Sequence, residues 1–212
     1  NLAMDSSSTK KFLIEKNYVQ KLTAMTTSAE PLLRLKSIWV LKNLVYRADS
    51  QLKKSLLKCI SWDDIYKLIC DQKQVHQEQQ KFKSSNNNSS ASLIISSSGD
   101  NAIVSDSTSI PEQAIAFIRN LLHGEYNQIE MIAKWRPQLG MDMLQVVKHY
   151  AKECSQLASQ QLQQPVIVII VQALFTLCNL AASDAQGLMT SCGSELIQVL
   201  LELMVCLIFL RA

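Results

Sequence analysis

The octet SIWVLKNL, residues 37–44, has two counterparts further along the chain, AIAFIRNL at residues 114–121 and ALFTLCNL at residues 173–180. In each octet a small residue lies six positions before the Asn, aliphatic residues lie five and two positions before it, and Leu follows it. A helix with 3.6 residues per turn places these four positions on one face. The octets therefore predict three amphipathic repeat helices, each with its Asn pointing away from the packed face.

Other helices are predicted around the octets by apolar spacing, capping residues and prolines near helix starts. Phe12, Leu13, Val19 and Leu22 make the apolar stripe of the first helix. The stretch 166–171 is apolar on every side, so its helix should be the most buried. The predicted helices are Thr9–Met25, Pro31–Tyr46, Ser50–Cys59, Asp63–Asp71, Ile110–His123, Asn127–Trp135, Gly140–Gln156, with Met143, Leu144, Val147 and Tyr150 facing inward, Pro165–Ala182 and, after a turn at residues 191–194, Glu195–Leu210.

A repeat period also appears between the octets. The pairs Val19-x-x-Leu22 and Ile65-x-x-Leu68 lie 46 residues apart, close to the roughly 40–47 residues of an armadillo-type unit. Between residues 84 and 109, however, 11 of 26 residues are Ser and few are apolar, which predicts a disordered insertion. We therefore divide the chain into armadillo-like repeats at 1–83, a Ser/Asn-rich insertion at 84–109, and further repeats at 110–212 with the last one incomplete.

Composition allows a large buried core but says little about partners. Apolar residues make up 48% of 212 residues, enough for one large domain or a short repeat array. The net charge of +3 is uneven, because residues 1–83 hold 15 Lys and Arg against 8 Asp and Glu, and residues 84–212 hold 6 against 10. A basic first part suits an acidic partner, and ordinary solvated helix faces explain it equally well.

The cysteines are those of a cytosolic or nuclear protein. The six cysteines, at 59, 70, 154, 178, 192 and 206, have no C-x-x-C or zinc-type spacing, so we expect reduced and buried thiols. No signal-peptide pattern opens the sequence. The apolar run Leu203–Leu210 is too short to span a bilayer, and we expect another repeat or another subunit to cover it.

Catalytic patterns are missing from the sequence. It contains no Gly-rich phosphate loop, no G-x-S-x-G and no H-E-x-x-H. His149 and Cys154 lie five apart on one predicted helix, so they point in different directions, and Asp63 and Asp64 favour a helix N-terminus. We expect no enzyme, no cofactor and no metal, and a protein partner rather than nucleic acid, a membrane or a small molecule.

The order of parts, an apolar helix, a polar loop and then a helix carrying the octet, resembles the armadillo repeat. Asn17–Leu22 followed by Leu33–Leu44 looks like one junction of such a repeat, and Ser191–Leu200 looks like another; HEAT-type arrays share similar short patterns. The resemblance implies an all-α, right-handed α-solenoid of three to four armadillo-like repeats that acts as a scaffold or adaptor.

In armadillo proteins the third helix of each repeat lines a groove, and its Asn side chains hold the main chain of an extended partner. A carboxamide suits this role because it both donates and accepts; an equal alternative is that each Asn bonds a loop of the neighbouring repeat. By position, the resemblance gives these candidate partner-binding residues: Lys36, Trp39, Asn43, Tyr46, Arg47, Gln113, Asn120, His123, Gln172 and Asn179.

Importin-type armadillo domains also carry a Trp four residues before the Asn. Here only Trp39 meets that pattern, while Ala116 and Phe175 occupy the other two places. The groove would be neutral to basic, whereas a basic import signal calls for carboxylates. An importin- or catenin-like peptide receptor is therefore the alternative rather than the main hypothesis.

A closer resemblance is to the armadillo-repeat scaffold subunits of GID/CTLH ubiquitin ligases, in their fungal form. It lies in the stretches IWVLKNLVYRAD at residues 38–49, SWDDIYKLICD at 61–71 and EQAIAFIRNLLHGE at 112–125. In that family the subunit is not catalytic and links the substrate receptor to the rest of the ligase. The resemblance implies other ligase subunits as partners and a place in the cytoplasm and nucleus.

Overall fold

The computed structural model describes residues 7–70, 109–124, 126–156 and 160–209. Among these residues the regular elements are all α-helices. The insertion predicted at 84–109 lies outside the described residues except for Ser109, which is buried and caps the following helix through its hydroxyl. The helices are α2 (Ser7–Glu15), α3 (Tyr18–Met25), α4 (Pro31–Val45), α5 (Ser50–Leu57), α6 (Trp62–Ile69), α8 (Ile110–Leu121), α9 (Tyr126–Trp135), α10 (Leu139–Gln156) and α11 (Gln160–Phe209).

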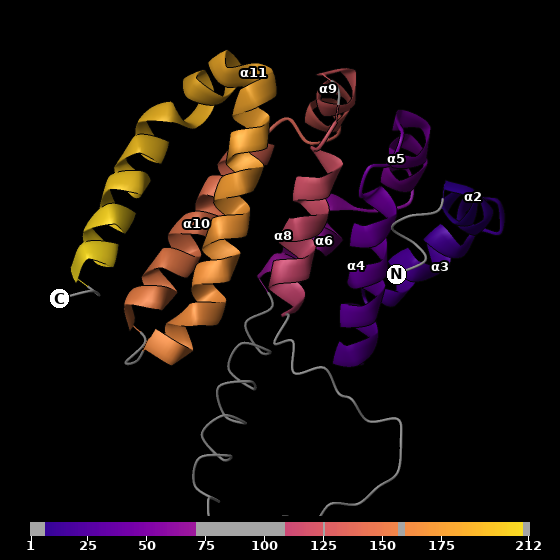
Figure 1. Ribbon diagram of the computed structural model, residues 1–212, viewed down its shortest axis with the longest axis horizontal. Helices are drawn as coiled ribbons and strands as arrows, with labels where there is room; N and C mark the ends of the chain where they lie inside the picture. The colour runs from indigo at the N-terminus through magenta and orange to yellow at the C-terminus, as the bar shows by residue number, and fades with distance from the viewer. Residues whose placement is uncertain (1–6, 71–108, 125, 157–159, 210–212) are drawn as a thin grey trace, which may run out of the picture.

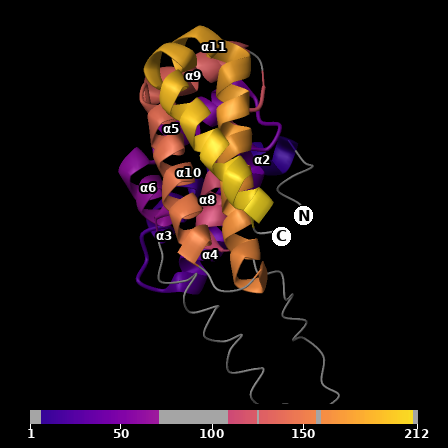
Figure 2. The same cartoon turned by 90° about the vertical axis from the view of Figure 1, so that its left-hand side faces the viewer.

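The helices form three units stacked side by side. The first helices of the units, α2, α5 and α9, contact one another in that order, and so do α4, α8 and α11. The second helix of each unit, α3, α6 or α10, follows the first helix in the sequence and packs against the third helix of the same unit (Figure 1). Figure 2 looks at the stack from the α11 end, with α10 and α11 nearest the viewer. This arrangement is an all-α solenoid, as the octets predict, in which each unit buries its apolar face against its neighbours.

The three octet-bearing segments, α4, α8 and the start of α11, are the motif helices from here on. Their packing positions are buried as predicted. The small residue six before the Asn is Ser37, Ala114 or Ala173, each at most 2% exposed. The aliphatic residue two before the Asn and the Leu after it are buried in all three, and only Leu174, at the remaining position, is partly exposed.

The most buried helix is α8, not the one predicted. Every residue of α8 except Glu112 and Arg119 is buried, because α4 and α11 flank it and α6 packs behind it. In the apolar stretch 166–171, Val166 is buried but Val171 is 40% exposed. Among the described residues, Gln164–Ala182 alone is long and apolar enough to cross a membrane by length and composition; here it packs on α10 and α8.

The first predicted helix, Thr9–Met25, is two helices, because a turn at Lys16 and Asn17 interrupts it. Asn17 has φ 56°, a left-handed conformation that Asn tolerates better than most residues. The break turns α3 away from α2, so the apolar stripe does not continue across it. Val19 is buried, but Phe12 is 51% exposed.

The last two predicted helices, Pro165–Ala182 and Glu195–Leu210, are one helix with a bend between them rather than two helices joined by a turn (Figure 1). The helix α11 continues through residues 191–194, and Figure 1 shows it as two arms joined by a bend at the upper edge of the molecule. We call residues 160–182 its first arm and 195–209 its second arm. The second arm packs on α10, where Lys148 pairs with Glu195 and Val199 is buried. The apolar residues Ile197, Leu201 and Met204 of this arm are more than half exposed.

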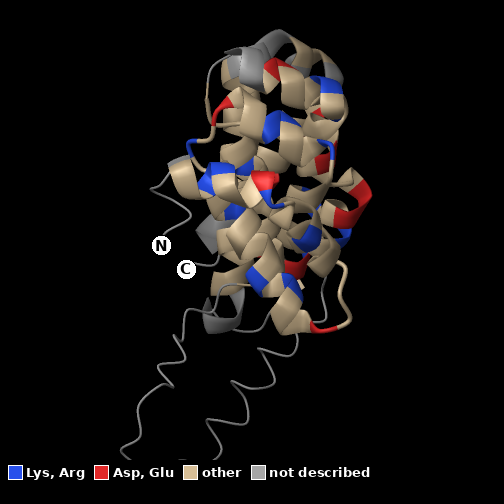
Figure 3. Cartoon of the chain, turned by 90° about the vertical axis from the view of Figure 1, so that its right-hand side faces the viewer, with Lys and Arg blue, Asp and Glu red and all other residues tan. Residues whose placement is uncertain are grey.

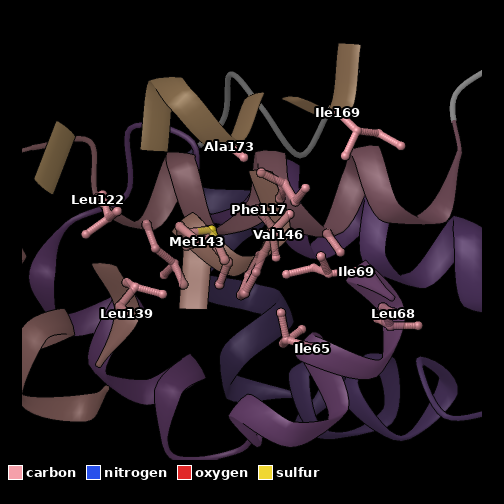
Figure 4. Close-up of a cluster of buried hydrophobic side chains, with 14 of the residues drawn as sticks. Ile65, Leu68, Ile69, Phe117, Leu122, Leu139, Met143, Val146, Ile169 and Ala173 are labelled. Atoms are coloured by element: carbon pink, nitrogen blue, oxygen red, sulfur yellow. The ribbon is translucent and has the colours of Figure 1, made fainter. Parts of the chain in front are cut away.

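One hydrophobic core runs through all three units, from Val19 of α3 and Ile38 of α4 to α10 and α11. Figure 4 shows Ile65 and Ile69 of α6, Phe117 of α8 and residues of α10 and α11 converging in one cluster. The predicted inward-facing residues of α10, Met143, Leu144, Val147 and Tyr150, are all fully buried. The Tyr150 hydroxyl donates to the carbonyl of Ile69 at 2.5 Å, so even this polar atom is satisfied inside the core.

The cysteines follow the packing rather than one rule. Cys154 and Cys192 are buried, and Cys59 is half-buried. Cys70, the C-cap of α6, and Cys178 of α11 are exposed, contrary to expectation. All five are free thiols, and Cys206 lies among residues whose side chains are not described.

Candidate functional site

The candidate site is the surface formed by the three motif helices, and their Asn side chains fix its register. Asn120 donates its side-chain amide to the carbonyl of Lys42 at 3.2 Å, and Asn179 donates to the carbonyl of Arg119 at 3.4 Å. In each pair the acceptor lies one residue before the Asn of the preceding motif helix. The same bond therefore recurs at both junctions, and it joins helix to helix rather than helix to loop.

A second bond recurs at the same junctions. Lys42 donates to the side-chain oxygen of Gln113 at 2.6 Å, and Arg119 donates to that of Gln172 at 2.5 Å. The cation lies one residue before its Asn, and the Gln lies seven residues before the next Asn. Arg119 also donates to the side-chain oxygen of Asn120 at 3.2 Å. We call these Asn, Gln and cation bonds the cross-unit ladder.

The ladder explains why the Asn side chains do not point away from the packed face as predicted. Asn43 and Asn120 are only 5% and 6% exposed, because each motif helix packs against another on that side. Burial also lowers the pKa of Lys42, an effect that outweighs the opposing pull of Glu112. A partly buried cation that donates to a carboxamide oxygen is well suited to hold two helices in one register.

The fixed register aligns the residues four before each Asn in one row across the helices. Trp39 is 41% exposed, Ala116 is buried and Phe175 is 54% exposed. Helices pack about 8–10 Å apart, so the buried Ala116 separates two exposed aromatic side chains on neighbouring helices. Lys36 lies over the Trp39 ring at 5.0 Å and adds a positive charge at the edge of the row. We call Trp39, Ala116 and Phe175 the aromatic row.

The remaining predicted site residues lie at the C-terminal ends of α4 and α8. Tyr46 and His123 both come three residues after an Asn, and their carbonyls accept from Lys10 and Lys53, each at 2.5 Å. Arg47 lies just beyond α4 with its guanidinium 5.2 Å from the Tyr46 ring centroid. These residues are thus separate from the aromatic row.

Two lysines that sequence reasoning missed close these helix ends. Lys53 of α5 is fully buried and donates to the carbonyls of Leu121 and His123, the last turn of α8. Its burial lowers its pKa to about 8. Lys10 of α2 is also buried and does the same for α4. A cation at a helix C-terminus satisfies orphan carbonyls and opposes the negative end of the helix dipole.

The signal for these lysines is a repeat within the repeat. Lys10 and Lys53 are each the fourth residue of a first helix and each begins a Lys-Lys pair. In α9 the fourth residue is Ile129, which is buried, followed by Glu130. A search restricted to the octets does not reveal this pattern, because it lies on a different helix of each unit.

Charge and metal-binding groups are sparse on these surfaces. In Figure 3, which views the end of the stack that carries α2 and α3, basic and acidic segments are interspersed. The described residues contain no group of three or more His, Cys, Asp or Glu that could hold a metal ion.

Known proteins show the same kind of repeat. Over 71 residues, 34% of the chain, the sequence is 32% identical to Armadillo repeat-containing protein 8 of Xenopus laevis and 31% identical to that of Mus musculus. The chain covers 10% of the length of these relatives. No protein-family model matches it. The similarity supports an armadillo-repeat protein, in agreement with the three-helix units, and proteins of this kind bind other proteins.

Proposed function

We propose that this chain is a non-catalytic scaffold within a multisubunit ubiquitin ligase, where it links the substrate receptor to the core of the complex. The observation that carries the proposal is the aromatic row, Trp39 and Phe175 on either side of Ala116. Exposed large aromatic side chains on a rigid surface are typical anchors of protein interfaces. The proposal also rests on the similarity to Armadillo repeat-containing protein 8 and on the resemblance to GID/CTLH scaffold subunits.

Rigidity is what makes this surface useful for a scaffold. The cross-unit ladder holds α4, α8 and the first arm of α11 in one register, so the two aromatic side chains keep a fixed separation. A preorganised surface loses little conformational entropy on binding. We propose that a subunit of the ligase binds at the aromatic row. We propose the cytoplasm and nucleus as the location of the complex.

The alternative is a receptor that holds an extended peptide through its Asn side chains. The geometry favours it less, because the Asn120 amide already donates to Lys42 and its oxygen accepts from Arg119. A basic import signal would also meet Lys36, Lys42 and Arg119 rather than carboxylates. The partner-binding roles of Asn43, Asn120 and Asn179 stay a prediction.

Affinity purification followed by mass spectrometry tests the proposal. The tagged protein should recover ligase subunits in stoichiometric amounts. The double variant Trp39→Ala, Phe175→Ser should reduce that recovery about tenfold or more, since two interface anchors of this kind together account for several kcal/mol. Both side chains are exposed, so the variant should keep the wild-type melting temperature.

The matched control is Phe12→Ser, which removes a similarly exposed aromatic residue from α2, outside the three motif helices. It should leave the recovery of ligase subunits unchanged. Recovery of import factors in place of ligase subunits would overturn the proposal in favour of the peptide receptor. Equal recovery by the double variant and the wild type would show that the aromatic row is not the interface.

A further inference from the structure

Arg47 lies where the backbone does not favour it. It comes four residues after Asn43, and its φ is 50°. The residue four after Asn120, at the same place in the second unit, is Gly124, with φ 151°. Both positions leave a motif helix through positive φ, which glycine adopts at no steric cost and a long side chain does not. The second unit thus follows the backbone preference, and the first unit does not.

The strained Arg47 borders a cavity. The cavity has a volume of about 880 Å³ and lies between α2, the end of α4 and the start of α5. These helices lie in the right-hand part of Figure 1, and the residues that line the cavity do not include those of the aromatic row. Lys10, Lys11 and Arg47 line it together with two acidic residues, Glu15 and Asp49.

The two acidic residues are already engaged. Glu15 pairs with Lys11 at 3.9 Å, and the Asp49 carboxylate accepts from the backbone amide of Leu52 at 2.8 Å as the N-cap of α5. The Arg47 guanidinium, by contrast, makes no ion pair within the part of the chain that the structure describes; its contact there is the Tyr46 ring. The lining therefore carries three cations, Lys10, Lys11 and Arg47, against two carboxylates, so the cavity keeps a net positive charge.

The position of the guanidinium suits a carboxylate. A guanidinium that lies over an aromatic ring keeps its N–H edge available, and that edge matches the two oxygens of a carboxylate. A cavity of this size is within the range that accepts a small ligand or a few side chains. Residues held in unfavourable backbone conformations concentrate at functional sites, and here such a residue presents an exposed guanidinium at the edge of the cavity.

We propose that this cavity, bordered by Arg47 and Tyr46, binds an acidic segment of a partner protein, with a Glu or Asp carboxylate held by the Arg47 guanidinium. The site is separate from the aromatic row, so it holds a second partner segment rather than restating the scaffold surface. Lys10, whose ammonium donates to the neutral Tyr46 carbonyl, adds positive charge to the same cavity.

The test measures binding and stability on the same variants. The probe is a fluorescein-labelled hexapeptide, Gly-Glu-Glu-Gly-Glu-Glu, titrated with the whole chain at low salt and followed by fluorescence polarisation. A peptide with Gln in place of each Glu should bind at least tenfold more weakly. Arg47→Gly should also weaken binding at least tenfold, and it should raise the melting temperature by about 2–4 °C because the strain is relieved.

A further variant separates the shape of the Arg47 side chain from its charge, and another serves as a control. Arg47→Lys keeps the charge but loses the planar fork, so binding should fall to between wild type and Arg47→Gly. The matched control Lys134→Ala removes an exposed cation of α9 that pairs with Glu130, far from the cavity, and it should bind as wild type does.

The proposal is overturned if Arg47→Gly binds the acidic peptide as tightly as wild type, or if the Gln peptide binds equally well. It is also overturned if inorganic phosphate at the same concentration displaces the peptide, since the site then takes any small anion. The Trp39→Ala, Phe175→Ser variant should bind the hexapeptide normally, so failure at one surface does not imply failure at the other.

Discussion

The first two units end their motif helices within two residues of the Asn, whereas the third does not. The helix α4 ends at Val45 and α8 ends at Leu121, but α11 runs from Gln160 to Phe209 and passes Asn179 without a break. The first helices differ in the same way. Lys10 and Lys53 are buried beneath the ends of α4 and α8, and Ile129 takes their place in the third unit.

The difference teaches how this fold closes a repeat. The C-terminal carbonyls of a helix need partners once the helix stops. A lysine reaching across from the first helix of the same unit supplies them, and its side chain fills the space below the helix end. In the third unit Ile129 stands in place of that lysine. The helix α11 continues past Asn179, so the carbonyl groups there accept hydrogen bonds from the next turn of the same helix.

Placing a lysine in the third unit should have the largest effect. We predict that Ile129→Lys lowers the free energy of unfolding by about 3–5 kcal/mol, because a charge would be buried with no free helix-end carbonyls to receive it. Chemical denaturation followed by circular dichroism measures the change. Glu130→Lys, at the exposed neighbouring position, should cost less than about 1 kcal/mol; similar losses for both variants would contradict the comparison.

Removing a lysine from the second unit should cost somewhat less. We predict that Lys53→Met lowers the free energy of unfolding by about 2–3 kcal/mol, since the buried carbonyls of Leu121 and His123 lose their donor. The neighbouring Lys54 is exposed, and Lys54→Met should stay within about 0.5 kcal/mol of wild type. Wild-type stability of Lys53→Met would mean that water or the backbone replaces the ammonium.

The protonation of Lys53 gives a smaller, pH-dependent effect. Its pKa in the folded protein is about 8, below the value of about 10.4 in an unfolded chain. Between these values the unfolded state binds more protons, so the free energy of unfolding rises with pH. We expect wild type to gain on the order of 1–2 kcal/mol over Lys53→Met between pH 8 and pH 10. No change in that difference would contradict the lowered pKa.

Much of the fold was predictable because the octets report local packing. Ser37, Leu41 and Leu44 are buried in the structure as their helical spacing predicts. The breaks were less predictable. Asn17 ends a helix through its own backbone angle, and α11 continues through residues 191–194 because Cys192 and Val199 pack on its neighbours. Both outcomes depend on local strain or on tertiary contacts that periodicity does not encode.

The candidate site was predictable in part, for a related reason. The sequence identifies Trp39 and Asn43 by their position in the octet, but not the residue that Asn120 would bond. That partner, the Lys42 carbonyl, lies 78 residues away. The strain at Arg47 is likewise invisible in the sequence, since the residue type does not predict its φ of 50°.

The two rungs of the cross-unit ladder differ in strength, and this gives the smallest predicted effect. The Asn120 amide is buried and lies 3.2 Å from the Lys42 carbonyl, whereas the Asn179 amide is partly exposed and lies 3.4 Å from that of Arg119. We predict that Asn120→Ala lowers the free energy of unfolding by about 1–2 kcal/mol, and Asn179→Ala by about 0.5 kcal/mol, because water can replace a partly exposed bond.

The same pair of variants separates a structural role from a peptide-binding role. If the Asn side chains serve the ladder alone, the loss of stability follows burial and the recovery of protein partners stays at the wild-type level for Asn179→Ala. If Asn179 instead holds a partner's main chain, its Ala variant should lose that partner while its melting temperature barely changes. Denaturant unfolding and affinity purification of the same two variants therefore decide whether each Asn serves the cross-unit ladder or binds a partner.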